Sequence, residues 1–146
     1  MKLSNVSFEE KSIWASLLIL LFVYSGYFSQ VYEGLISNSL SKVDISVLFI
    51  GTVITIVFFQ IVFQIIMAIS NSKDADQPSD ERDRLFAMKA GNVSGWVLGS
   101  GVIAVTLLIF AIDLNSLWTA NLLLFSMVVS QAVCYILQLF YYRRGY

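Results

Sequence analysis

The chain contains no histidine. Histidine is the commonest general base and the commonest metal ligand, so its absence removes the usual catalytic and zinc-binding chemistries. The single cysteine, Cys134, excludes an intrachain disulfide and any zinc site built from several thiolates. We therefore expect a protein that is not an enzyme and that holds no metal or cofactor.

Charge is also scarce. Only 13% of the residues are charged, whereas a soluble domain has about 25%. A formal net charge of −1 argues against a surface that binds nucleic acid directly. Since 58% of the 146 residues are hydrophobic, a soluble fold of this size could not bury them all, and we expect the lipid bilayer to surround the chain.

Long apolar runs dominate what is present. A membrane span needs about 20 mostly apolar residues, and helices satisfy their backbone polar groups within lipid. None of the runs has a charged residue inside it, and none shows the alternation of a barrel strand. We predict an all-α fold, an integral membrane four-helix bundle in a single domain, 1–146. Its spans are expected at about 13–30, 45–69, 93–112 and 117–141.

The basic residues predict the orientation. Eight of the nine Lys and Arg residues fall in the leader, in the connection between the second and third spans, and in the tail. Lys42 alone lies on the other side. Because short cytoplasmic segments carry the excess of positive charge, we expect a multi-pass protein of the cell inner membrane with both termini in the cytoplasm.

The charge concentrates in one stretch, Asp80-Glu81-Arg82-Asp83-Arg84. Pro78 ends any preceding helix, and Ser79 is a suitable N-cap for a new one. A helix running from Asp80 to Ile112 would be about 50 Å long, whereas the hydrocarbon layer is about 30 Å thick. We therefore expect a cytoplasmic loop and helix extension over about 70–92.

This extension has two interpretations. The first is a solvated helix start that also anchors the topology. The second is a docking surface for a cytoplasmic partner, with Leu85 and Met88 as additional apolar contacts. Its expected residues are Asp80, Glu81, Arg82, Asp83, Arg84, Phe86 and Lys89. A calcium loop counted from Asp74 does not fit, since its sixth and twelfth residues would be Ser79 and Leu85 instead of Gly and Glu.

The segment DERDRLFAMKAGNVSGWVLGSGV, residues 80–102, resembles a motif of small four-helix inner-membrane proteins of bacteria and archaea, most of them uncharacterised. In that family the pattern D-E-R-D/E, K-A and V-L-x-x-G-V also opens the third span after a cytoplasmic loop. Some relatives are encoded beside small helix-turn-helix regulators. The resemblance implies, for this chain, a role in restraining or sensing through a DNA-binding partner of this kind. No known activity is carried over with the motif.

Within the spans, Gly91, Gly95 and Gly99 are spaced by four. Small residues at this spacing let a second helix approach closely. We expect Gly95 and Gly99 to serve helix packing, either within one chain or across a homo-oligomer.

Polar amides form a second pattern. Gln60 and Gln64 share a face of the second span, and Gln131 and Gln138 share a face of the fourth. We expect them to bond to Ser, Thr or Asn on neighbouring helices. An alternative function is an oligomeric small-solute transporter or channel lined by these glutamines. The lack of a charged residue inside the spans disfavours it.

Overall fold

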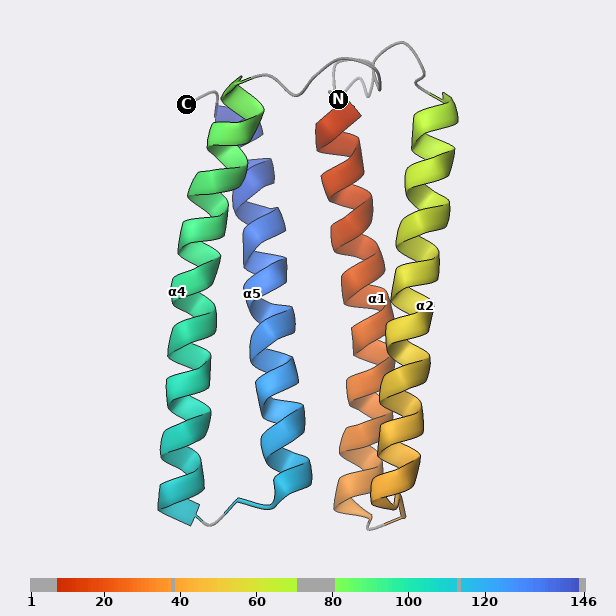
Figure 1. Ribbon diagram of the computed structural model, residues 1–146, viewed down its shortest axis with the longest axis vertical. Helices are drawn as coiled ribbons and strands as arrows, with labels where there is room; N and C mark the ends of the chain where they lie inside the picture. The colour runs from red at the N-terminus through yellow and green to blue at the C-terminus, as the bar shows by residue number, and fades with distance from the viewer. Residues whose placement is uncertain (1–7, 38, 71–80, 113, 145–146) are drawn as a thin grey trace. The chain divides into compact units, whose positions relative to one another are not determined.

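The computed structural model describes residues 8–37, 39–70, 81–112 and 114–144. All regular secondary structure in these ranges is α-helical (Figure 1). The helices are α1 (Phe8–Ile36), α2 (Lys42–Ser70), α4 (Glu81–Ile112) and α5 (Ser116–Arg144). Each contains one of the apolar runs, so the all-helical prediction is confirmed, and all four are long and apolar enough to cross a membrane.

Helix α4 carries residues 81–84 of the charged stretch and the third apolar run without a break. Its 32 residues correspond to about 48 Å at 1.5 Å per residue. This confirms the long continuous helix expected from the sequence. Pro78, Ser79 and Asp80, which were expected to start it, lie outside the described residues.

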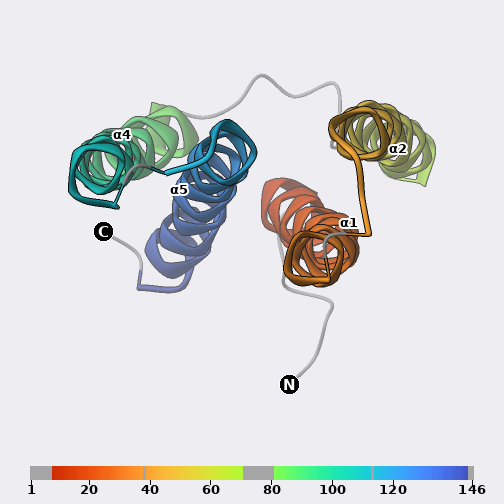
Figure 2. The same cartoon turned by 90° about the horizontal axis from the view of Figure 1, so that it is seen from below.

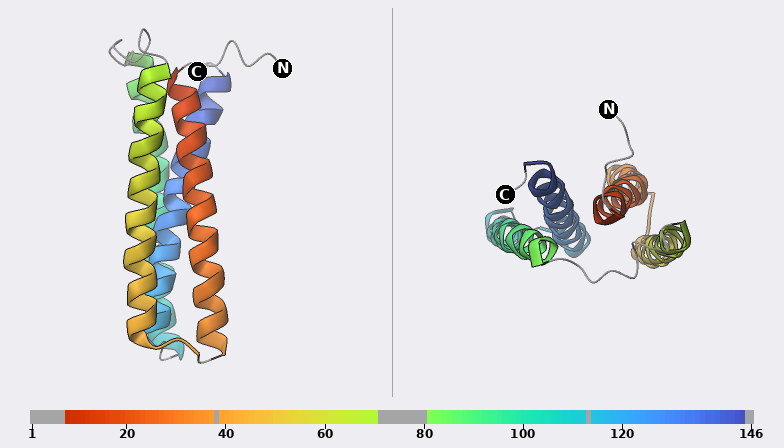
Figure 3. Two further views of the ribbon diagram at one scale, coloured as in Figure 1. Left: turned by 90° about the vertical axis from the view of Figure 1, so that its right-hand side faces the viewer. Right: turned by 90° about the horizontal axis from the view of Figure 1, so that it is seen from above.

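The chain divides into two compact units, Met1–Pro78 and Ser79–Tyr146. Helix α1 packs against α2 in the first unit, and α4 packs against α5 in the second. The members of each pair run antiparallel and remain beside each other when the molecule is turned (Figures 1, 2 and 3). Each unit is therefore a helical hairpin, and the bundle expected from the sequence stays a prediction.

The turn of the first hairpin is specified by its side chains. Asp44 Oδ2 accepts hydrogen bonds from the backbone N–H of Ser41, at 2.9 Å, and from the Ser41 hydroxyl, at 2.7 Å. Ser41 Oγ in turn accepts the Asp44 N–H at 3.2 Å. This is a reciprocal capping box that satisfies backbone donors at the start of α2. Gly34 leaves the space on α1 that the Leu40 side chain occupies.

In the second hairpin, α4 ends at Ile112 and α5 begins at Ser116. Asn115 caps α5, because its Oδ1 accepts the N–H of Leu117 at 3.0 Å. So short a connection holds α4 and α5 as antiparallel neighbours along their length.

Candidate functional site

The charged start of α4 is divided between two faces of the helix. Phe86, Ala90 and Ser94 are buried, and their spacing of four places them on one face. On the opposite side, Leu85 and Met88 are 53% and 65% exposed. Only part of the predicted docking surface is therefore available to a partner.

Phe86 is not an exposed contact. It is only 2% exposed, and its ring centroid lies 5.8 Å from that of Tyr141 and 5.3 Å from that of Tyr142. The prediction that Phe86 contacts a partner directly is wrong, because the residue lies on the side of α4 that packs against the last turns of α5. Ring pairs at these separations are stabilising beyond the area that they bury.

Asp83 also turns toward α5. The Tyr142 hydroxyl donates a hydrogen bond of 2.7 Å to Asp83 Oδ1. The Arg82 guanidinium lies over the Phe86 ring, 5.1 Å from its centroid, within the range of a cation–π interaction. Two charged residues of the predicted docking surface thus have partners inside their own hairpin.

The remaining predicted contacts among the described residues are exposed. Glu81, Arg84 and Lys89 are exposed along with Leu85 and Met88. Asp80, the first residue of the predicted set, lies outside the described residues. We call Glu81, Arg84, Leu85 and Met88 the outer face of α4. Their positions i, i+3, i+4 and i+7 form one side of a helix.

The glycine of α4 that lies close to α5 is not one of the two predicted to serve helix packing. A Cβ built on Gly95 or Gly99 meets nothing within 4 Å. A Cβ on Gly101 would lie 2.7 Å from Ser126 Cβ and 2.8 Å from Ser126 Oγ. The close approach of α4 to α5 therefore depends on Gly101, and Gly95 and Gly99 do not provide it.

The glutamines of α2 bond to α1. Ser16 Oγ donates to Gln60 Oε1 at 3.1 Å, and Gln64 Nε2 donates to Ser12 Oγ at 3.0 Å. Ser12 and Ser16 are both buried. The expected serine partners lie one helical turn apart on α1, so the two bonds form a short polar ladder between the helices.

The glutamines of α5 do not form an equivalent ladder. Gln131 is exposed, and Gln138 Nε2 donates to Cys134 Sγ within its own helix at 3.4 Å. The polar bond between α4 and α5 comes from Ser130, whose Oγ donates to the backbone oxygen of Ser94 at 2.8 Å. The glutamine pattern in the sequence did not indicate this serine, since its acceptor is a backbone group.

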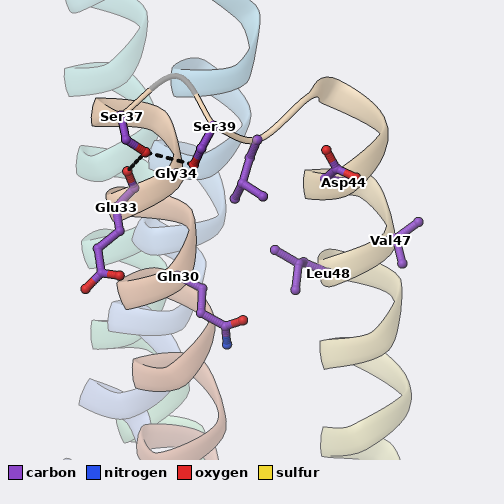
Figure 4. Close-up of a pocket in the computed structure, with 9 residues that line it drawn as sticks. Gln30, Glu33, Gly34, Ser37, Ser39, Asp44, Val47 and Leu48 are labelled. Atoms are coloured by element: carbon purple, nitrogen blue, oxygen red, sulfur yellow. Dashed lines mark hydrogen bonds between the residues drawn. The ribbon is translucent and has the colours of Figure 1, made fainter.

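The turn between α1 and α2 borders an open hollow of about 560 Å³ (Figure 4). Gln30 and Leu48 point toward the space between the two helices, whereas the Glu33 side chain points away from it. Ser37 Oγ donates to the backbone oxygen of Glu33 and bonds to Ser39 Oγ. The polar groups here hold the turn, and their chemistry specifies no ligand.

Metal-ligating side chains do not cluster in the part of the chain that the structure describes: no group of three or more His, Cys, Asp or Glu comes together there. Comparison with protein-family models, with curated proteins and with solved structures gives no match. The resemblance carried by residues 80–102 therefore stays an expectation.

Proposed function

We propose that the chain is a multi-pass protein of the cell inner membrane with both termini in the cytoplasm. The four helices are apolar enough to span the bilayer, and large apolar side chains along them are exposed, including Phe22, Trp96 and Phe110 at 80%, 82% and 84%. Lipid is the surrounding that accommodates such side chains without cost. The antiparallel pairing of α4 and α5 also gathers Arg82, Arg84, Lys89, Arg143 and Arg144 at one end of the hairpin, as the positive-inside rule requires of a cytoplasmic end.

The role proposed for this protein is non-enzymatic: it binds a cytoplasmic protein through the outer face of α4. The observation that carries the proposal is the exposure of Leu85 and Met88 beside Glu81 and Arg84 on a helix that is longer than the hydrocarbon layer is thick. Leu85 and Met88 supply two apolar anchors spaced by three, which is part of the i, i+3, i+4, i+7 pattern by which a helix enters a groove of its partner. The charged neighbours would then select the orientation of that partner.

The resemblance to inner-membrane proteins encoded beside helix-turn-helix regulators favours a regulator as the partner, and another subunit of a membrane complex is the second possibility. The exposed Gly95 and Gly99 would suit contact with a further copy of the chain. The transporter alternative has less support, since Gln60 and Gln64 direct their hydrogen bonds to serines of α1.

The test uses two matched double variants. In Leu85→Ser/Met88→Ser the apolar anchors of the outer face are lost. In Ile36→Ser/Val43→Ser two similarly exposed apolar residues are changed, one at the end of α1 and one at the start of α2. We expect the first variant to bind the partner at least about tenfold more weakly, since losing an anchor typically costs 1 kcal/mol or more, and the second to bind it as the wild type does.

The partner is identified by placing a photo-crosslinking residue at position 88 in growing cells and analysing the adduct by mass spectrometry. A cytoplasmic protein found at position 88 and absent at position 36 supports the proposal. An adduct profile that is the same at both positions, or affinity that survives the loss of Leu85 and Met88, contradicts it.

A further inference from the structure

We propose that Asp83 is a positioning residue. Together with Phe86, Tyr141 and Tyr142 it forms a clamp that holds the projecting start of α4 against α5 and so fixes the direction in which the outer face of α4 points. The function of that face rests on the docking role proposed above, whereas the clamp itself is a property of the second hairpin.

The aromatic part of the clamp is a closed cluster. Tyr142 meets Phe86 edge to face, with an angle of 80° between the rings, and Tyr141 lies over it at 34°. Phe86 is the largest side chain that is fully buried among the described residues. Arg82 covers the ring from its own helix. The rotation of α4 at this level is therefore determined by where Phe86 can be accommodated.

The polar part of the clamp fixes the same rotation independently. Tyr142 and Asp83 are 59 residues apart in the sequence, and their hydrogen bond of 2.7 Å joins the two helices. Asp83 acts here as an acceptor. An asparagine side chain can accept the same hydroxyl proton, because its carbonyl oxygen occupies the same place. The hydrogen bond therefore requires an oxygen at this position and does not require a negative charge.

The position of the clamp along the helices explains why it is needed. Phe86 lies about 39 Å from Ile112 at 1.5 Å per residue, and the hydrocarbon layer is about 30 Å thick. Under the proposed insertion the clamp is therefore outside the hydrocarbon. An isolated helix of three turns is marginal in water, so the packing of α5 keeps this part of α4 helical and oriented.

The consequence for binding follows from the geometry of the helix. Asp83, Phe86 and Ala90 recur at three and four residues and face α5. Leu85 and Met88 therefore point away from α5. Losing the clamp would let the start of α4 fray or turn, and the anchors would no longer be presented together.

The first test measures hydrogen exchange of the amides in residues 81–90, with the full chain in lipid nanodiscs. Tyr142→Phe removes only the hydroxyl, and we expect exchange to become about fivefold faster, which corresponds to the loss of one hydrogen bond. Asp83→Asn keeps an acceptor and should leave exchange unchanged. Tyr32→Phe, at an exposed tyrosine of α1, is the control. If the amides of residues 81–90 exchange in Tyr142→Phe as slowly as in the wild type, the proposed clamp is refuted.

The second test separates positioning from direct contact by measuring affinity for the crosslinked partner. A positioning role predicts that Tyr142→Phe and Asp83→Ala weaken binding and that Asp83→Asn restores it. The reverse pattern, in which Asp83→Asn binds as poorly as Asp83→Ala while Tyr142→Phe binds normally, would show that the charge of Asp83 meets the partner and would refute the positioning role. If the wild type binds no partner, the docking function fails, and the exchange measurement still decides the clamp.

Discussion

At the scale of single residues, Gly101 is the glycine of α4 that faces α5. An added methyl group would lie 2.7 Å from Ser126 Cβ, so the two helices would have to separate. We expect Gly101→Ala to lower the free energy of unfolding by about 1–3 kcal/mol, the usual cost of overpacking. The measurement is reversible unfolding in mixed micelles, followed by circular dichroism or by steric trapping.

Gly99→Ala is the matched control, since a Cβ there meets nothing within 4 Å. It should leave the stability unchanged or raise it, because alanine favours the helix. Adding Ser126→Gly to Gly101→Ala makes room for the methyl group and should recover most of the loss. If Gly99→Ala proves as harmful as Gly101→Ala, close packing at Gly99 by a surface outside this hairpin is the better explanation.

These glycines also show what the sequence could not decide at this scale. The spacing of Gly91, Gly95 and Gly99 predicted that small residues of α4 serve helix packing. It could not indicate which of them faces α5, because that depends on Ser126 and on the rotation of the partner helix. Phe86 was misassigned for a related reason: beside charged residues it looked exposed, and only the fold shows that it meets the tyrosines of α5.

At the scale of elements, the polar ladder joins α1 and α2. Ser16→Ala deprives Gln60 of its donor on α1. An interhelical hydrogen bond of this kind contributes about 0.6–2 kcal/mol in membrane proteins, and we expect a loss of stability in that range. Unfolding in mixed micelles measures it. Gln131→Leu, at an exposed glutamine of α5, is the comparison and should be neutral.

A further variant, Gln60→Leu, separates the ladder from a solute pathway. A Gln60→Leu protein that loses stability and shows no change in solute flux, measured in reconstituted vesicles, agrees with a structural role. Flux that is present in the wild type and abolished by Gln60→Leu at unchanged stability would instead support the transporter alternative.

The helices themselves were predictable, and their ends were less so. Apolar runs of about 20 residues specify membrane-spanning helices by length alone, and the charged start of α4 was recognised because nothing in it breaks a helix. The helices nevertheless extend beyond the predicted spans, since the caps formed by Ser41 and Asn115 lie in polar turns that hydropathy does not describe. Local side-chain chemistry determines where these helices begin.

At the scale of the whole molecule, the connections of the two hairpins follow from the sequence, whereas the faces that pack do not. Short polar segments between apolar runs leave no choice except antiparallel neighbours. In helices that meet lipid, apolar residues surround the whole circumference, so the usual contrast between an apolar and a polar face is missing. Small and polar residues such as Gly101, Ser94 and Ser130 then decide which sides meet.

The orientation of the chain is the prediction that affects every proposed role, and cysteine labelling tests it. In a Cys134→Ser background, Met88→Cys places a thiol at the start of α4 and Ile36→Cys places one at the end of α1, both at exposed positions. Because the Lys and Arg residues gather at the end that holds Met88, a membrane-impermeant maleimide should label Ile36→Cys in intact cells and Met88→Cys only after the membrane is opened. Labelling of Met88→Cys in intact cells would place the outer face of α4 in the periplasm. A cytoplasmic partner for it would then be impossible, although the clamp between α4 and α5 would be unaffected.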